Sequence, residues 1–169
     1  VVAREFKFLN PFMEGTFSAT PPLEALKFCL SYAKTTKRKA SAGRNANGNN
    51  IAKFKIMILD VSRAHFHPPC RRELYIELPE EDRIEGEDMV GRLKRTLYGT
   101  RDASSEWQLY SMKTFQDCGL TPGVSNPTLF EASAENDLTI GYEHGDDIVL
   151  VGEEEFLLNC EKQLGKHIK

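Results

Sequence analysis

Three stretches of the chain repeat apolar residues at helical spacing, and each is predicted to be a helix. The first covers about 22–34, where leucines and an alanine recur every three or four residues behind two prolines that suit a first turn. The second covers about 102–118, where one face gathers a tryptophan, a methionine, a phenylalanine and a cysteine before Gly119. The third has the acidic run 153–155 as its first turn, because acidic side chains favour the N-terminal end of a helix dipole.

Five further stretches have the patterns of β-strands. Residues 54–61 form a nearly unbroken apolar run, which predicts a strand buried on both faces of a sheet with Asp60 near its end. Residues 73–78 alternate apolar and acidic side chains and predict a half-exposed strand, and 128–131 predict a short one. Residues 138–142 and 148–151 flank a short acidic turn, which predicts a β-hairpin with Asp146 and Asp147 at its tip.

Two polar stretches are predicted to be loops. Residues 35–50 contain no large apolar side chain and are rich in glycine, asparagine, serine and basic residues, which predicts a flexible insertion outside the core. Residues 79–88 are mostly acidic and are typical of a solvated surface turn.

The composition excludes several classes of protein. With 169 residues and 40% hydrophobic content, the chain suits one globular domain with a real core, and neither disorder throughout nor a disulfide-stapled miniprotein fits. The formal net charge of −3 excludes nucleic-acid binding by bulk charge alone, but it leaves a local basic groove open. The four cysteines lie far apart without a C-x-x-C pair, so we expect buried free thiols.

The sequence also bears on location. It contains no run of about 18 to 20 apolar residues that would span a bilayer, and its first residues lack the order of a secretion signal, so we expect an intracellular protein, cytoplasmic or nuclear, without a membrane partner. The chain begins with Val1 instead of Met, and its first residues resemble a strand that begins in mid-run, so we expect a piece of a longer protein.

The aspartates of the two strand ends are candidates for metal chemistry. If the strand that ends near Asp60 lies beside the hairpin that carries Asp146 and Asp147, three carboxylates converge. Carboxylate oxygens are preferred ligands of Mg²⁺ and Mn²⁺, and two such ions stabilise the attacking and leaving oxygens of a phosphoryl transfer. Taken singly, Asp60 also fits a strand-end turn residue, and Asp146 and Asp147 also fit a solvated hairpin tip.

Six segments in order along the chain point to a known family. They are 2–6 (VAREF), 17–20 (FSAT), 59–66 (LDVSRAHF), 92–99 (RLKRTLYG), Trp107 and 146–148 (DDI). As an ordered set, they resemble the reverse transcriptase of copia-type LTR retrotransposons. The resemblance implies an α/β (α+β) fold, the fingers-palm portion of such an enzyme, with a mostly antiparallel palm sheet packed on helices and the thumb absent. Residues 1–169 would form one partial reverse transcriptase domain.

The same resemblance implies the site. Asp60, Asp146 and Asp147 would be the catalytic, metal-binding acids, and the backbone carbonyl of Val61 would join them in holding two Mg²⁺ or Mn²⁺ ions. His65 falls where the family usually has an aromatic residue beside the sugar of the incoming nucleotide.

Three further positions would contact the nucleotide or the template. Gly99 lies in a loop that would pack on the template base and the nucleotide, because glycine permits close backbone approach. Arg101, in the same loop, would be available for a phosphate. Arg4 matches a basic fingers residue that would meet the triphosphate.

The resemblance implies an RNA-directed DNA polymerase that transfers nucleotides to a primer 3′-OH. Its partners would be an RNA or DNA template-primer, deoxynucleoside triphosphates and the rest of a pol polyprotein, with its integrase and RNase H, in a cytoplasmic virus-like particle or the nucleus. Besides His65, four positions depart from the family pattern: His144 and Gly145 replace Tyr-Val, Asp102 replaces Gln and Ser104 replaces Pro.

Three other interpretations are open. A catalytically inactive retroelement-derived relic, or interaction module, would keep the fold without binding metal or template. A palm-type nucleotide cyclase would act on a nucleotide without a template. A zinc site at His65, His67 and Cys70 would use imidazole and thiolate ligands.

Overall fold

The computed structural model describes residues 3–6, 11–35, 37–39, 51–132 and 138–168. The chain divides into two compact units. One consists of Val1–Ser18 and Arg63–Tyr110, and we call it the ribbon unit; the other consists of Ala19–Ser62 and Ser111–Lys169, and we call it the sheet unit. The boundary falls within the helix α2 (Ala103–Asp117), whose residues are therefore shared between the two units.

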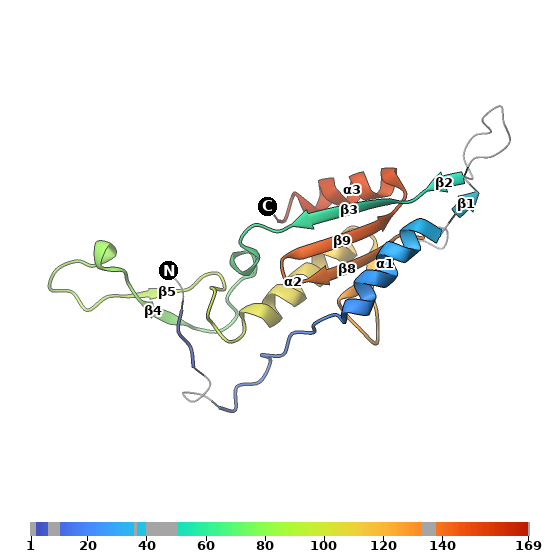
Figure 1. Cartoon of the computed structure of the whole chain (residues 1–169). Helices are drawn as coiled ribbons and strands as arrows, with labels where there is room; N and C mark the ends of the chain where they lie inside the picture. Colours follow the sequence, from blue (N-terminus) through green and yellow to red (C-terminus); the bar gives the residue numbers. More distant parts are fainter. Residues whose placement is uncertain (1–2, 7–10, 36, 40–50, 133–137, 169) are drawn as a thin grey trace. The chain divides into compact units, whose positions relative to one another are not determined.

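The sheet unit is built on a five-stranded antiparallel sheet in the order β3-β9-β8-β7-β6 (Figure 1). Its strands are β3 (Lys55–Asp60), β6 (Leu120–Pro122), β7 (Leu129–Ala132), β8 (Ile140–His144) and β9 (Asp147–Gly152). The hairpin predicted over 138–151 is the pair β8–β9, joined by a turn of two residues. The prediction of a mostly antiparallel sheet is confirmed.

Helices cover both faces of this sheet. The helix α1 (Leu23–Thr35) packs on the face that carries Tyr142 and Val149, and Figure 1 shows it lying across β8 and β9. Side chains alternate between faces along a strand, so Phe130 points to the opposite face, where its ring lies 4.3 Å from that of Phe115 in α2. The helix α3 (Glu154–Leu164) contacts β9 and β3. All three predicted helices form, and the predicted α/β class is confirmed.

The strand β3 is less buried than its sequence predicts. The apolar run 54–61 predicts burial on both faces, yet Ile58 is 71% exposed and Ile56 is also exposed. The reason is the strand order: β3 pairs only with β9 and is an edge strand of the five-stranded sheet. An apolar run indicates a strand, but it does not indicate which strands will flank it.

A second sheet, of two strands, takes one strand from within the predicted insertion and the other from just after it. The strands β1 (Lys37–Lys39) and β2 (Ile51–Lys53) pair antiparallel. Residues 36 and 40–50, which make up most of the insertion predicted over 35–50, lie outside the described residues.

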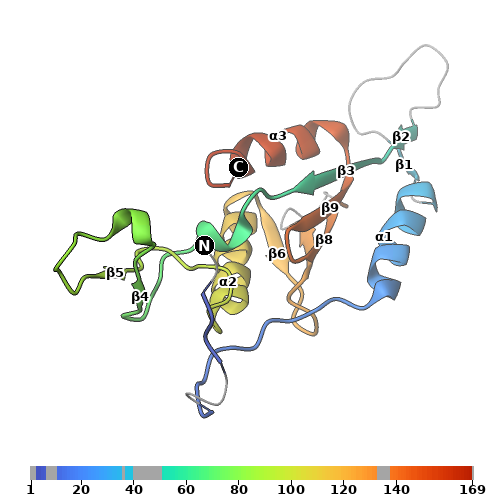
Figure 2. The ribbon, with the colours of Figure 1, turned by 60° about the vertical axis from the view of Figure 1, so that its left-hand side comes forward.

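The ribbon unit contains little regular structure. The strands β4 (Tyr75–Glu77) and β5 (Val90–Arg92) form a two-stranded antiparallel ribbon, drawn in green in Figure 2. The predicted strand 73–78 corresponds to β4, and the acidic loop after it contains one short 3-10 helix, η3 (Glu80–Asp82). A second short helix, η2 (Ala64–Phe66), comes near the start of the segment Arg63–Tyr110.

The cysteines largely follow the prediction. All four are free; Cys29, Cys118 and Cys160 are buried, whereas Cys70 is only partly buried. No helix within the described residues is long and apolar enough to cross a lipid bilayer.

Candidate active site

The β8–β9 hairpin presents two aspartates at its turn. Gly145 has a φ angle of 63°, in the left-handed region that glycine adopts without steric cost. Two-residue hairpin turns require this conformation, so Gly145 allows the chain to reverse at Asp146. Asp147 is then the first residue of β9. The glycine that departs from the family pattern is therefore compatible with a tight turn at this point.

The third aspartate lies beside this turn. Asp60, the last residue of β3, is paired with Asp147 in the β3–β9 register, and the N–H of Val61 donates to the carbonyl oxygen of Asp146 at 2.9 Å. Hydrogen-bonded and non-hydrogen-bonded pairs alternate along an antiparallel ladder. Because Val61 and Asp146 are hydrogen-bonded, the adjacent pair of Asp60 and Asp147 is a non-hydrogen-bonded one, whose Cβ atoms lie about 4.5 to 5.5 Å apart. The structure thus brings the three predicted acids and Val61 together at one end of the sheet.

His144 extends the same row across the sheet. It is paired with Asp147 in the β8–β9 register, so Asp60, Asp147 and His144 share one face. All three are exposed, although α1 covers this face further along the strands around Val149. The end of the sheet that carries the acids is therefore open to solvent within this unit.

The donor chemistry of this end fits a hard divalent cation. Carboxylate and carbonyl oxygens suit Mg²⁺ and Mn²⁺, and the strand register sets Asp60 opposite Asp147. Within the described residues, however, no three histidine, cysteine or acidic side chains are grouped to hold a metal ion. Like charges directly opposite each other on a sheet repel, so in the absence of a cation the two carboxylates favour rotamers that point away from each other. We conclude that these residues provide the kind of ligand that the ion prefers and lie in a suitable strand register, but that their side chains do not already form a complete set of ligands.

The four residues predicted to contact nucleotide or template, Arg4, His65, Gly99 and Arg101, all belong to the ribbon unit. The N–H of Ala3 donates to the carbonyl of Tyr98 at 2.8 Å, and that of Glu5 donates to the carbonyl of Gly99 at 3.3 Å. Arg4 lies between these two bonds with its side chain exposed. Gly99 itself has a φ angle of 91°, which favours glycine.

His65 joins this group through its ring. Its centroid lies 4.5 Å from that of Tyr98, and the ring of Phe66 lies 5.5 Å from the same tyrosine. The hydroxyl of Thr96 also donates to the carbonyl oxygen of His65. The structure therefore brings all four residues to one loop cluster, and their roles stay predictions.

Arg72 lies at the centre of this cluster. Its guanidinium donates to Asp102 through Nε at 2.7 Å and Nη2 at 3.0 Å, and to Glu5 through Nη1 at 2.8 Å and Nη2 at 2.5 Å. Glu5 Oε2 also accepts the backbone N–H of Arg101 at 3.0 Å. One arginine thus holds two carboxylates, each in a bidentate pair, and one of these carboxylates holds the loop of Arg101.

The charges of this clamp shift the pKa values of its members. The hydrogen bond from Arg72 is the main cause that lowers the pKa of Glu5. Burial of Asp102 works to raise its pKa, but the hydrogen bond and charge of Arg72 outweigh burial, and the pKa is lowered. The pKa of Arg72 is raised, first by its hydrogen bond to Asp102 and then by that to Glu5. The clamp therefore favours the charged form of all three groups.

Sequence reasoning did not find Arg72 or Glu5 as site residues. Arg72 lies 67 residues from Glu5 and 30 from Asp102, in a polar stretch without a motif. In the sequence, Asp102 stands out as a departure from the family pattern. The one signal was the unusual acid at Asp102, which suggests a compensating basic partner, but one sequence does not show which residue that partner is.

The three side chains of the zinc interpretation have other neighbours. The ring of His67 lies 6.1 Å from that of Trp107 and 6.4 Å from that of Tyr110, the latter nearly parallel. His65 packs on Tyr98, and Cys70 Sγ donates to the carbonyl oxygen of Arg72 at 3.3 Å. Together with the lack of a three-ligand group in the described part of the chain, these contacts give zinc no support.

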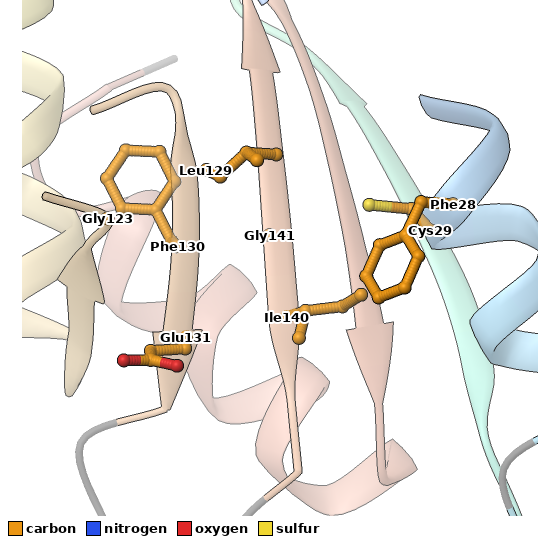
Figure 3. A pocket seen from close by; sticks show the side chains of 8 residues that line it. All are labelled: Phe28, Cys29, Gly123, Leu129, Phe130, Glu131, Ile140 and Gly141. Carbon is orange, nitrogen blue, oxygen red and sulfur yellow. The ribbon is translucent and has the colours of Figure 1, made fainter. Parts of the chain in front are cut away.

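The sheet unit also contains an apolar pocket of about 210 Å³ between α1 and the strands β7 and β8 (Figure 3). Phe28, Leu129 and Ile140 supply apolar side chains to it, and Glu131 is the charged residue of its lining. Ile140 begins β8, whereas His144 ends it beside the acids. The pocket therefore does not include the carboxylates of the candidate site.

Two comparisons with known proteins found a match. A family model described as "Reverse transcriptase (RNA-dependent DNA polymerase)" matches residues 49–169, which include all three aspartates. The chain is 29% identical over 102 residues to a "Retrovirus-related Pol polyprotein from transposon TNT 1-94" of Nicotiana tabacum. This alignment covers 59% of the chain and 8% of the relative, so the chain spans a small part of that polyprotein. No solved structure matches the chain.

Proposed function

Because this chain belongs to the reverse transcriptase (RNA-dependent DNA polymerase) family, in its copia-type retrotransposon form, we propose that it carries the nucleotidyl-transfer site of such an enzyme. The reaction would join a deoxynucleoside triphosphate to a primer 3′-OH opposite an RNA or DNA template. The sheet unit would correspond to the palm and the ribbon unit to the fingers.

One observation carries the proposal. The β3–β9 register sets Asp60 directly opposite Asp147, and the Val61 N–H bond to Asp146 fixes the turn beside them. Two facing carboxylates destabilise a sheet unless a cation neutralises them. An exposed pair of this kind at a sheet end is therefore a reason to expect a cation-binding role rather than a contribution to the fold.

The residues of the chain would divide the work as follows. Asp60, Asp146, Asp147 and the carbonyl of Val61 would hold two Mg²⁺ or Mn²⁺ ions. Bound ions would supply stabilisation of the charge on the attacking and leaving oxygens. The rigid β3–β9 pairing would keep the carboxylates at a constant spacing, which reduces the cost of ordering them when the cations and the substrate arrive.

The ribbon-unit cluster would bind the nucleotide. The N–H groups of Ala3 and Glu5 bond to carbonyls of the loop that carries Gly99, and the Arg101 N–H bonds to the Glu5 carboxylate. The segment of Arg4 and the loop of Arg101 are thus tied together, and the two arginines would bind phosphate oxygens. The ring of His65, supported by Tyr98, would lie beside the sugar. His65 is smaller than the usual aromatic residue, so we expect weaker exclusion of ribonucleotides.

The test is single-nucleotide extension of a DNA primer on an RNA template with Mn²⁺. It compares this chain, the chain fused to a family thumb, and the Asp146→Asn/Asp147→Asn double variant of each. Asp88→Asn is the matched control, because it removes one exposed acid from the ribbon unit. Electron paramagnetic resonance of bound Mn²⁺ gives a second readout that does not depend on turnover.

Extension that requires the two acids and survives Asp88→Asn would support the proposal. The absence of both Mn²⁺ binding and extension from either form, with folding confirmed, would favour an inactive relic. Release of pyrophosphate from a nucleotide without template would instead favour a cyclase.

A further inference from the structure

We propose that Arg72 is a positioning residue that holds the loop of Gly99 and Arg101 and the segment of Arg4 as one rigid nucleotide-binding platform. This inference rests on the function proposed above and deepens it, because it assigns a role to a residue outside the predicted site. It starts from the hydrogen bonds of a single guanidinium group.

The hydrogen bonds of Arg72 restrict the orientation of the carboxylate groups of both Asp102 and Glu5. Nε and Nη2 form one bidentate pair with Asp102, and Nη1 and Nη2 form a second with Glu5. A planar guanidinium fixes the orientation of both carboxylates, which a lysine ammonium does not do. The side chain of Arg72 is 29% exposed and that of Asp102 is 8% exposed, so the bonds are formed in a partly desolvated place.

Each carboxylate passes this constraint to the predicted binding loop. Glu5 Oε2 accepts the N–H of Arg101, and it is the same oxygen that Arg72 Nη2 contacts. Asp102 is the next residue after Arg101 and immediately precedes α2. The loop is therefore held at two neighbouring residues: Arg101 through Glu5, and Asp102 directly by Arg72.

The same carboxylate also fixes the N-terminal segment. Glu5 follows Arg4, and the backbone N–H groups on either side of Arg4 donate to Tyr98 and Gly99. A loss of Arg72 would leave Glu5 and Asp102 as two neighbouring negative charges without their shared partner. Their repulsion would push the Arg4 segment and the Arg101 loop apart, which weakens a site that needs both arginines on one triphosphate.

Two measurements test the role. The first is hydrogen exchange of the Arg101 amide in the full chain, and the second is the KM and kcat for the incoming deoxynucleotide in the Mn²⁺ extension assay. For Arg72→Gln we expect amide exchange about tenfold faster or more, and KM about tenfold higher with kcat within twofold. Arg72→Lys, which keeps the charge but not the fork, should restore only part of either loss.

Arg92→Gln is the matched control. It removes an arginine of the same unit from an exposed pair with Glu73 at 3.3 Å and should change neither readout. If Arg72→Gln does not fold, Glu5→Gln replaces it, because Arg72 then keeps Asp102 while the bond to Arg101 is weakened.

The outcomes separate this inference from the proposed function. Unchanged amide exchange, or faster exchange with an unchanged KM, overturns the inference alone. A fall in kcat at constant KM also overturns it, since a platform for the nucleotide acts on binding. If the unsubstituted chain and its thumb fusion extend nothing, the proposed function fails and the nucleotide role of Arg72 falls with it; the exchange measurement then still shows whether Arg72 fixes the loop.

Discussion

Replacing Asp60 with Asn is expected to stabilise the metal-free protein and to remove its response to Mn²⁺. The substitution keeps the size of the side chain and removes one of two facing negative charges. In a protein whose strand-end acids served only the fold, the same change would be neutral or destabilising. The sign of the effect therefore separates a cation site from a structural role.

The magnitude follows from the register. Carboxylates on a non-hydrogen-bonded pair lie about 4 to 7 Å apart, depending on their rotamers. Because both side chains are exposed, the dielectric constant of water applies, and Coulomb's law gives a repulsion of about 0.6 to 1 kcal/mol. This corresponds to roughly 1 to 4 °C in Tm for a protein of this size.

A saturating cation reverses the order of stability of the unsubstituted chain and Asp60→Asn. Mn²⁺ at about one hundred times its Kd adds about 2.7 kcal/mol to the stability of a protein that binds it only when folded. The unsubstituted chain should therefore unfold at a lower temperature than Asp60→Asn in EDTA and at a higher temperature in Mn²⁺. Low salt keeps the repulsion from being screened.

Thermal denaturation with EDTA or MnCl₂, with Asp88→Asn as control, measures both effects. Equal stabilisation of the chain and of Asp60→Asn by Mn²⁺ would refute the reasoning. So would a metal-free Asp60→Asn variant less stable than its parent.

Three further predictions follow from contacts within single units. The two carboxylate partners of Arg72 have lowered pKa values, so the stability that they add is present above their ordinary pKa values of 4.5 and 3.8 and is lost as the pH falls through the lowered values of the folded protein. Arg72→Gln should therefore make the free energy of unfolding, measured by tryptophan fluorescence, depend less on pH in this range. A Cβ on Gly152 would lie 2.0 Å from Thr139 Oγ1, so Gly152→Ala should cost about 1 to 3 kcal/mol in urea unfolding, and no loss would contradict the packing. A hydrogen bond from Cys160 lowers the pKa of Cys118, so Cys160→Ala should raise that pKa in a ¹³Cβ titration.

The local elements were readable from the sequence because their signals lie within a few residues. Apolar periodicity located α1, α2 and α3, and an acidic turn between two apolar runs located the β8–β9 hairpin. Asp146 and Asp147 had to lie near a hairpin tip once that turn was recognised. The same local reasoning went wrong for β3, where Ile58 proved exposed.

The arrangement of the site was decided by tertiary structure. The pairing of β3 with β9 sets Asp60 opposite Asp147, and no residue near Asp60 indicates which strand will lie beside it. The resemblance to a family supplied that expectation; the pattern of the chain did not.

The clamp of Arg72 shows the same limit more clearly. Its partners Glu5 and Asp102 lie 67 and 30 residues away, and each of the three looks like an ordinary surface charge in the sequence. Periodicity and turn chemistry act between neighbours along the chain, so the sequence by itself determined the elements and the acids at the hairpin turn. Strand order and ion pairing depend on which distant segments fold against one another, so only the tertiary structure brought Asp60 to Asp147 and Arg72 to its two carboxylates.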